Sequence, residues 1–527
     1  MYLNIRVVLA EDSSDGITSL LPLPELLGKL SVARVVSFPA LRAHQAPAWR
    51  AFLVQVAVMG IETIGLDEAP GDDPAAWGQV LRALTPDSAD TAWSLIAPPD
   101  KPAFLQPPAP DMKEYTGRIS TPDALDVLVT SKNHDAKVER QSEADQDDWA
   151  FALVSLQTQE GFMGAGNFGI SRMNGGFGSR PYLMMRAADS LSFWDGFRRD
   201  VDALLAARQS RFVQAERRGF DVTDGVKLLW LKPWDGRQQL SVDELNPLFV
   251  EICRRVRLIH ENGRIVAATA SSAKARIAAK DFKGDLNDPW GAVESGDEQK
   301  LLSITSDGFN YKRMVQILFG DASRKYRRGL LAEPAKAEKK QDLLLECFAL
   351  ARGQGKTEGF HTRSVSLPRR AAWGLSDGTE AEALARLANE RVEVSGTVAS
   401  KALRPALIVL TQKGPEEPAW KKPANEPMTR DALARFNAAV DETFFPALWR
   451  DLDLGTDEAR EKAWANDLAA IARQTFVEAL DAAPRSEVRR IIAEARARNM
   501  LESSLYKHLP SLRNTKAMEA DNVTDAA

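Results

Sequence analysis

From about Gly374 onward, apolar residues recur at helical spacing, and this pattern restricts the fold more than any other feature of the chain. Spacings of three and four residues place such side chains on one face of a helix. Four amphipathic helices with short links predict a four-helix bundle over residues 374–513. The repeats are Leu384, Leu387, Val394 and Val398; Leu433, Phe436, Val440 and Phe444; Trp464, Leu468, Ile471 and Phe476; and Val488, Ile491, Ile492, Ala495, Leu501, Leu505 and Leu509.

Local signals mark the ends of these helices. Thr456, followed by two acidic residues, is expected to cap the third helix. Pro446 kinks or ends the second helix, because proline has no backbone N–H to donate. Residues 514–527 are polar, and we expect them to form a disordered tail.

Residues 1–373 have a mixed pattern and predict one large α/β domain. Trp49, Phe52, Leu53 and Val56 recur as the buried face of a helix. The apolar run Trp149–Gln157 resembles a strand, whereas the run before Gly353 resembles a helix. The predicted fold class is therefore α+β, a large mixed α/β N-terminal domain followed by an all-α four-helix bundle.

Composition limits the classes of function. The 527 residues exceed one ordinary domain, and the net charge of −5 argues against a protein that coats nucleic acid. Local basic clusters such as Arg254–Arg257 form either an electropositive groove or a solvated face. Without a membrane span or a secretory signal, we expect a cytoplasmic protein with no membrane partner. Cys253 and Cys347 are expected to be reduced core thiols, so no cofactor or metal is predicted.

The stretch Gly161–Pro181 is rich in glycine and lacks helical periodicity. Glycine has no Cβ, so such a stretch brings bare backbone N–H groups against a ligand. Gly164 to Gly169 spells G-x-G-x-x-G, but the continuation is too rich in glycine to open the helix that a dinucleotide site requires. We interpret the stretch as a loop that approaches phosphate or a groove edge, against the alternative of a surface loop without a ligand.

Three further stretches offer polar groups. The polar run Ser131–Lys137 has the donors that a sugar-phosphate backbone requires, whereas the adjacent pair His134-Asp135 gives no basis for catalysis. Lys274 and Lys280 precede an Asp-Pro turn. The second glycine-rich stretch, Gly353–Gly359, contains Gly-Lys-Thr, but a phosphate-binding P-loop needs glycine where Leu350 stands and a strand before it. No enzyme is therefore predicted.

Several stretches together resemble one known family. They are SFPALRAHQAPAWRAFLVQ, LVTSKNHD, the glycine-rich stretch, ITSDGF, ARGQGKTEGFHTR and SLYKHLPSL, in this order along nearly the whole chain. The chain resembles the large subunit of the type I-E CRISPR Cascade complex, the CasA family. The resemblance implies a non-catalytic protein that contacts the crRNA 5′ handle, reads the protospacer-adjacent motif (PAM) of double-stranded DNA, helps to start unwinding and R-loop formation, and recruits the helicase-nuclease. Its implied partners are crRNA, target DNA, the other Cascade subunits and that helicase-nuclease.

The resemblance also assigns residues. Those that would contact the crRNA handle are Ser131, Lys132, Asn133, His134 and Lys137. Those of the glycine-rich stretch that would face the PAM are Gly164, Gly166, Asn167, Gly169, Arg172, Asn174 and Gly175. The nearest positions to the family's minor-groove reader and wedge are Lys356, Thr357, Glu358 and Gly359, and the lysine finger would be Lys274 or, second, Lys280. Some relatives hold zinc with cysteines between the glycine-rich stretch and the lysine finger. Only Cys253 lies in that region of this chain, so no zinc is implied.

Two alternatives remain at this stage. The chain would be a structural ribonucleoprotein scaffold if the glycine-rich stretch and Lys274 were dispensable for target binding. It would be a nucleotide-binding enzyme if the isolated protein bound nucleotide saturably. We expect the glycine-rich stretch to be exposed, so that Gly169→Asp weakens DNA binding without disturbing the fold.

Overall fold

Helix α2 (Ala46–Thr63) is the centre of the hydrophobic core in the N-terminal part of the chain. Its residues from Pro47 to Ile61 are all buried, and Trp49 and Phe52 are fully enclosed. A helix that is apolar on every side must be covered on every side. Accordingly, α2 contacts helices α3 (Pro74–Ala83), α6 (Gln146–Thr158) and α7 (Gly196–Ala206) and strand β7 (Leu245–Val250). The predicted buried helix is confirmed.

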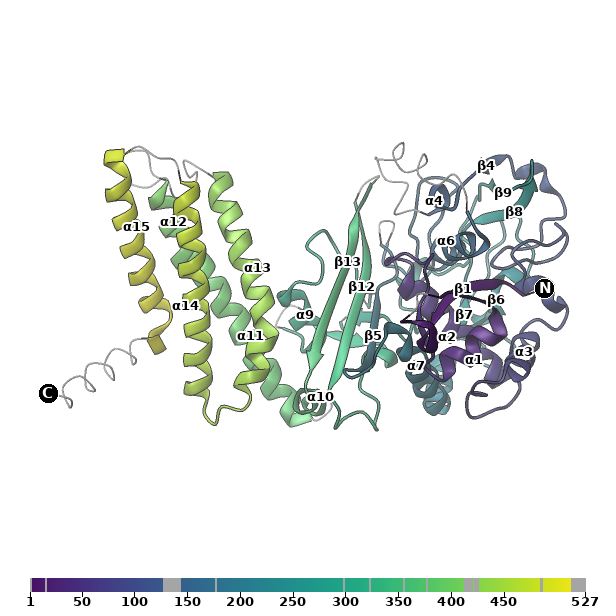
Figure 1. Ribbon diagram of the computed structural model, residues 1–527, viewed down its shortest axis with the longest axis horizontal. Coiled ribbons are helices and arrows are strands. Elements are labelled where there is room, and N and C mark those ends of the chain that lie inside the picture. The colour runs from purple at the N-terminus through teal and green to yellow at the C-terminus, as the bar shows by residue number, and fades with distance from the viewer. Residues whose placement is uncertain are drawn as a thin grey trace. The chain divides into compact units, whose positions relative to one another are not determined.

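The chain divides into two units (Figure 1). The first comprises Met1–Phe309 and Arg324–Trp373, and the second comprises Asn310–Ser323 and Gly374–Ala527. The structure, a computed structural model, describes residues 2–14, 17–126, 144–175, 178–296, 299–321, 324–353, 356–375, 378–411, 420, 426–483 and 487–512. The predicted α+β fold class is confirmed, because small sheets and helices mix in the first unit and helices make up the second.

Short sheets, rather than one continuous sheet, make up the β-structure described in the first unit. Their orders are β2-β1-β3, β13-β12-β5 and β4-β9-β8, with the pairs β6-β7 and β10-β11. The strands other than β7 are β1 (Asn4–Leu9), β2 (Ser19–Pro22), β3 (Val35–Ser37), β4 (Gly117–Ile119), β5 (Tyr182–Ala187), β6 (Val226–Leu228), β8 (Arg255–Glu261), β9 (Arg264–Ala270), β10 (Ala292–Glu294), β11 (Tyr326–Arg328), β12 (Leu343–Gly353) and β13 (Lys356–Leu367). The remaining helices of this part are α1 (Leu23–Ser31), α4 (Pro122–Leu125), α8 (Arg208–Arg217) and α10 (Arg369–Gly374).

The strand predicted for Trp149–Gln157 is wrong, because these residues form helix α6. All residues from Trp149 to Thr158 are buried, so the apolar run has neither the helical nor the strand period. The helix begins where the backbone N–H of Asp145 donates to the Asp148 carboxylate at 2.8 Å. That capping interaction satisfies a backbone group at the first turn.

The helix predicted before Gly353 is also wrong. Strands β12 (Leu343–Gly353) and β13 (Lys356–Leu367) form a long antiparallel hairpin (Figure 1), paired from Leu343 opposite Leu367 to Gly353 opposite Lys356 with a register shift between Ala351 and Arg352. Strand β5 pairs with the other edge of β12, which is therefore the central strand of this sheet. Because consecutive residues such as Leu345, Glu346 and Cys347 are buried on both faces of β12, its sequence lacks the alternation of a strand and resembles that of a buried helix.

The second unit consists of long helices that pack together. The chain runs from α11 (Gly378–Thr397) through a π-helical segment (Val398–Leu403) into α12 (Arg404–Leu410), and then through three more helices. Helix α13 contacts α14, and α12 contacts α15. The short helix α9 (Tyr311–Leu318), which the sequence analysis places in the first domain, contacts α11 and α13. The three later helices are α13 (Glu426–Asp451), α14 (Asp457–Ala482) and α15 (Glu487–His508).

Details of these helices correct and confirm the predictions. Thr456 caps α14 as expected, with its hydroxyl accepting from the Ala459 N–H at 3.2 Å. Pro446 does not end its helix, since α13 continues to Asp451. On α15 the predicted apolar face is wrong in its N-terminal half, where Ile491 is 75% and Ile492 54% exposed. None of the helices described is long and apolar enough to cross a bilayer.

Candidate nucleic-acid interface

The glycine-rich stretch links α6 to β5 and closes upon itself. The Ile170 N–H donates to the Glu160 carbonyl at 3.0 Å, and the Arg180 N–H donates to the Gln159 carbonyl at 3.3 Å. A Cβ at Gly161 would lie 2.1 Å from the carbonyl oxygen of Gly178. Glycine at position 161 therefore allows the two ends of the loop to touch.

The tip of this loop is a turn from Met163 to Asn167. The Met163 N–H donates to the Asn167 carbonyl at 2.9 Å, and the Asn167 N–H donates to the Gly164 carbonyl at 3.0 Å. Gly164 and Gly166 have φ angles of 105° and 83°, in the region that favours glycine. Asn167 is exposed, as is Ala165 between the two glycines. The tip thus presents backbone at its two glycines, the Asn167 amide and the side chain of Met163, which is 40% exposed.

Arg172 leaves the loop surface and enters the core. Its Nη1 donates to the Phe249 carbonyl at 2.9 Å, its Nη2 donates to the Pro247 carbonyl at 3.2 Å, and its guanidinium carbon lies 3.7 Å from the centre of the Phe249 ring. Burial, together with the charge of Arg180, lowers the pKa of Arg172 to about 10. Arg172, predicted to face DNA, is only 1% exposed in this arrangement and holds the loop in place.

The other predicted loop positions differ in accessibility. A Cβ at Gly169 would lie 2.6 Å from the backbone of Gly161 and Phe162, so Gly169 is packed inside the loop. This finding overturns the expectation that Gly169→Asp leaves the fold intact. Asn174 is half-buried, and Gly175 is exposed with a φ of 76°.

The lysine stretch meets the tip of the glycine-rich loop. After β9 ends, the Ser272 N–H donates to the Gly166 carbonyl at 3.0 Å. Two residues further, the Lys274 N–H donates to the Gly236 carbonyl at 3.1 Å, and the Lys274 side chain is exposed. Two stretches predicted separately are therefore joined by a backbone hydrogen bond. Lys274 stands beside the exposed turn.

The turn at Gly236 is a part of this arrangement that the sequence analysis missed. Its carbonyl accepts from both Ala273, at 2.7 Å, and Lys274. Asp235 accepts from the backbone N–H groups of Arg237 and Gln238 at 2.8 and 3.0 Å, which fixes the turn. The Asp-Gly dipeptide is a turn signal that was available in the sequence.

Lys280 lies in a second turn against the loop. It opens a short 3₁₀ segment, Lys280–Phe282, and its side chain is exposed. Gly284 follows with a φ of 85°, and a Cβ there would lie 2.7 Å from the backbone of Met173. The turn that carries Lys280 therefore packs on the glycine-rich loop.

A polar pocket of about 680 Å³ opens where these segments converge. It is lined by Asn167 from the loop tip, by Arg237 from the Gly236 turn, by Arg255 from β8 and by Ser271 after β9. The lining residues also include Glu114, Thr116, Gly117, Asp235, Thr269, Ala270, Ser272 and Ala273. The pocket therefore combines amide, hydroxyl, guanidinium and carboxylate groups.

The basic cluster on β8 is neither a groove nor a solvated face. Arg254, Arg255 and Arg257 are 7%, 6% and 1% exposed. The Arg257 guanidinium donates to main-chain carbonyls of the segment 97–107, including those of Ala97 and Pro107 at 2.9 and 3.2 Å. Burial lowers the pKa of Arg257 to about 10. These arginines stabilise the scaffold that supports the site.

The second glycine-rich stretch forms the turn end of the β12–β13 hairpin. Lys356, Thr357 and Glu358 lie on β13, but their side chains are outside the described part of the chain. Gly359 has a φ of 145°, beside a register shift at Ala351. Since Gly-Lys-Thr leads into a strand and not a helix, the helix N-terminus of a P-loop is missing here. A P-loop NTPase site is therefore still rejected, although the run before Gly353 is a strand and not the predicted helix.

Two stretches of the family resemblance meet at this hairpin. Gly308, from ITSDGF, has a φ of 62°, and a Cβ there would lie 2.7 Å from Nδ1 of His361, from EGFHTR. His44, from the first stretch, packs edge-on against Phe360 with ring centres 6.3 Å apart. The part of the hairpin near the end of β12 and the start of β13 is thus a junction of stretches far apart in the sequence.

The polar run predicted to contact the crRNA handle, Ser131–Lys137, lies outside the described residues. Its flanks are anchored. Before it, Asp126 is buried, with its carboxylate 2.8 Å from His44 Nε2 and 2.7 Å from Gln45 Nε2. Although burial alone would raise the pKa of Asp126, the hydrogen bond and charge of His44 hold it below its ordinary value. After it, Arg6 donates to both oxygens of Asp147 at 2.8 and 2.9 Å.

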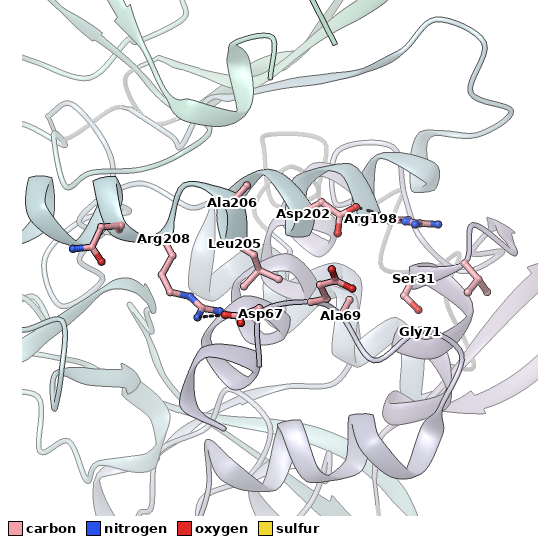
Figure 2. Close-up of a pocket in the computed structure, with 12 residues that line it drawn as sticks. Ser31, Asp67, Ala69, Gly71, Arg198, Asp202, Leu205, Ala206 and Arg208 are labelled. Carbon is pink, nitrogen blue, oxygen red and sulfur yellow. Dashed lines mark hydrogen bonds and ion pairs between the residues drawn. The ribbon is translucent and has the colours of Figure 1, made fainter. Parts of the chain in front are cut away.

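A separate cavity of about 770 Å³ lies between α1, α7 and the connection from α2 to α3 (Figure 2). Two ion pairs lie in its lining, Arg208 with Asp67 at 3.1 Å and Arg198 with Asp202 at 3.6 Å. The lining residues include none of the described positions that the sequence analysis assigns to a site.

The two cysteines are buried and not bonded to each other. The Cys253 thiol donates to the Leu156 carbonyl at 3.0 Å, and burial raises its pKa to about 11. Burial raises the pKa of the Cys347 thiol as well. Both are inert thiols at neutral pH, in agreement with the expected core positions.

The comparisons with known proteins identify the fold. No protein-family model matches the sequence, and no curated protein matches it. Among solved structures, Cse1 from Thermobifida fusca aligns with a TM-score of 0.64 and 16% identity over 97% of this chain and 98% of that chain. The CRISPR-associated protein Cse1 from Acidimicrobium ferrooxidans gives 0.63 and 16% over 96% and 97%. CasA (Cse1) from Thermus thermophilus gives 0.60 and 14% over 95% and 97%. The chain therefore has the Cse1/CasA fold along nearly its whole length.

Proposed function

We propose that this protein is the non-catalytic large subunit of a type I-E Cascade complex, which reads the PAM of double-stranded target DNA. The observation that carries the proposal is the Cse1/CasA fold over 95–97% of the chain, with more than 95% of each solved chain covered as well. The sequence stretches that resemble the CasA family support it independently.

The contact between the glycine-rich loop and the lysine stretch supports the PAM-reading part. From Gly164 to Gly166 the turn has no side chain larger than a methyl group, with Ala165 exposed, and Lys274 follows the Ser272 N–H that donates to Gly166. A turn without large side chains fits a narrow groove, and a lysine beside it reaches a base edge or phosphate. From the minor groove a protein distinguishes mainly A·T from G·C pairs, which permits a relaxed motif. The guide RNA then reads the remaining sequence by base pairing.

The remaining roles follow as one proposal. The run Ser131–Lys137, between its anchored flanks, contacts the crRNA 5′ handle. Lys356, Thr357, Glu358 and Gly359, at the turn of the hairpin, form the wedge that begins unwinding. A wedge between base steps costs a few kcal/mol of unstacking, which phosphate contacts and the forming R-loop offset. The protein contacts the other Cascade subunits, and the assembled complex recruits the helicase-nuclease.

The test is a measurement of duplex affinity in the reconstituted complex. Wild-type protein, crRNA and the neighbouring subunits are assayed at fixed salt with a matched target flanked by a library of motifs. The Lys274→Ala variant should lose about 1–3 kcal/mol of binding for preferred motifs if the lysine contacts a base edge. A uniform loss with a shallower salt dependence would make Lys274 a phosphate contact instead. A flat motif profile in the wild type would contradict PAM reading and leave the chain a scaffold.

A further inference from the structure

The turn Asp235–Gln238 carries a second cation beside Lys274. Arg237 projects from this turn with its side chain 73% exposed. Gly236, the preceding residue, accepts the backbone N–H of Lys274. Arg237 and Lys274 are therefore mounted on one backbone junction, next to the tip of the glycine-rich loop.

The junction is rigid. Asp235 holds the N–H groups of Arg237 and Gln238. A Cβ at Gly236 would lie 3.1 Å from both Arg255 Nη1 and Ser272 Cα, so the turn sits closely on β8 and on the lysine stretch. A cation on such a support loses little conformational freedom of the backbone when it binds a ligand.

Of the two arginines that line the pocket, Arg237 has the weaker ion pair and is the one that can bind an added anion. Glu114 is held at 2.7 Å by the buried Arg255, and Asp235 is occupied by the two backbone N–H groups. Arg237 reaches Glu114 at only 3.7 Å, with both side chains exposed, and an exposed ion pair of this kind contributes little. An arriving phosphate can therefore take the guanidinium from Glu114.

We propose that Arg237 binds a backbone phosphate of the DNA duplex at the mouth of the pocket formed with Asn167 and Ser271. The ligand class is a phosphodiester, which a guanidinium recognises with two parallel N–H donors. Asn167 and Ser271 line the same pocket and add neutral hydrogen-bonding groups. The inference rests on the proposed function and adds a residue to its DNA interface.

The experiment compares Arg237→Gln with Arg264→Gln in the reconstituted complex. Arg264 is an exposed arginine at the first residue of β9, about 20 Å along that strand from Ala270 at its other end. One phosphate contact contributes about 0.9 to the slope of log affinity against log salt. When salt rises from 50 to 200 mM, the fold-decrease in affinity should therefore be about 3.5 times smaller for Arg237→Gln than for the wild type. The loss at low salt should be equal for every flanking motif. Arg264→Gln should match the wild type.

A second variant tests the role of Glu114. Glu114→Gln keeps an oxygen acceptor for Arg255 and removes the charge that competes with phosphate, so duplex binding should tighten. The double variant with Arg237→Gln should abolish that gain. Thermal unfolding of Arg237→Gln should match the wild type because its side chain is exposed, whereas Glu114→Gln should lower the midpoint slightly because the buried Arg255 loses its charge partner.

The outcomes separate the two proposals. Suppose that duplex affinity of the wild type depends on the motif and that Lys274→Ala reduces this affinity, but that Arg237→Gln gives the same result as Arg264→Gln. The inference about Arg237 is then wrong and the proposed function stands. A loss of crRNA association in Arg237→Gln with normal duplex binding would also overturn it, by making the ligand RNA. If the wild type has no motif dependence, the proposed function itself fails.

Discussion

Arg180 illustrates how a charged residue in the glycine-rich stretch serves the interior. Its Nε and Nη2 donate to the two oxygens of Asp288 at 2.6 and 2.8 Å, and its guanidinium lies 5.1 Å from the centre of the Trp290 ring. Arg172 enters the core beside Glu251 in the same way, with the two groups 3.9 Å apart. The loop is thus fixed at two buried points, which leaves its tip exposed on a defined support.

Gly169 gives a prediction about this support. Gly169→Asp should distort the loop, since its side chain would meet the backbone of Gly161 and Phe162, and overpacking of this kind costs about 1–3 kcal/mol. Asn167→Ala, at the exposed tip, is the matched control and should keep the wild-type stability. The thermal midpoint of the first unit measures both. Equal midpoints for all three proteins would contradict the packing described for Gly169.

Asp126 gives a second prediction. Asp126→Ala leaves His44 and Gln45 buried without their acceptor, and removing one partner of a buried pair costs about 3–5 kcal/mol. Chemical denaturation of the first-unit transition, with wild type as reference, measures the loss. A change below 1 kcal/mol would show that solvent or another group replaces the carboxylate.

The same carboxylate gives the stability a pH dependence. Its pKa is lowered in the folded state, so the unfolded chain binds more protons as acid is added. The stabilisation is complete above the ordinary aspartate value of about 3.9 and is lost as the pH falls through the lower folded value. The stability difference between wild type and Asp126→Ala should therefore shrink below about pH 4. A constant difference would contradict a charged role for Asp126.

At the scale of elements, the two halves of α15 differ in how far their apolar side chains are buried. Ala497, Leu501 and Leu505 are buried at successive four-residue steps, whereas Ile491, Ile492 and Ala495 are exposed. The helix therefore derives its packing from its C-terminal half. Helical spacing alone identifies a continuous apolar face but does not indicate how far a neighbouring helix extends along it.

This difference predicts unequal costs for two similar substitutions. Leu501→Ala should destabilise the second unit by about 2–5 kcal/mol, as expected for a buried leucine. Ile491→Ala should change its stability by no more than about 0.5 kcal/mol, as for an exposed surface site. Helical circular dichroism during urea unfolding measures both. A large loss for Ile491→Ala would mean that this end of the helix is covered.

The sequence predicted elements wherever one face is apolar and the other polar. That condition holds for the long helices of the second unit, and their prediction as helices is confirmed. It fails for α6, which is buried from Trp149 to Thr158, and for β12, where buried residues such as Leu345, Glu346 and Cys347 follow one another on both faces of the strand. The glycine-rich loop and Lys274 were both found as candidates, but their meeting at Gly166 and Ser272 depends on the sheet that carries β9. The Gly236 turn was missed because its role is to accept the N–H groups of Ala273 and Lys274, a contact between segments far apart in the sequence.

At the scale of the whole molecule, the division between the units does not follow one cut in the chain. Residues 310–323 belong with the helices of the second unit, although strands of the first unit follow them. Tyr311, Met314 and Leu318 are buried on α9, which contacts α11 and α13. The backbone N–H of Tyr311 also donates to Asp441 on α13 at 2.5 Å.

Truncation tests this division. Deleting residues from Gly374 onward should leave the apolar face of α9 uncovered and give an aggregating protein that binds a hydrophobic dye. Deleting the same residues and replacing 310–323 with a Gly/Ser linker of equal length should give a monomeric first unit. Size-exclusion chromatography distinguishes the two. Identical behaviour of both truncated chains would contradict the assignment of α9 to the second unit.

The placement of α9 has a consequence for synthesis on the ribosome. Helix α9 emerges before β12 and β13 and long before α15, which ends at His508. At bacterial or eukaryotic elongation rates, the 190 residues from 319 to 508 take roughly ten to forty seconds to add. During the first part of that interval the first unit lacks its hairpin, which is complete at Leu367, and α9 lacks its partner helices until α13 is complete at Asp451. The nascent chain therefore carries two unfinished cores at once, and its yield should depend on chaperones that bind short apolar helices.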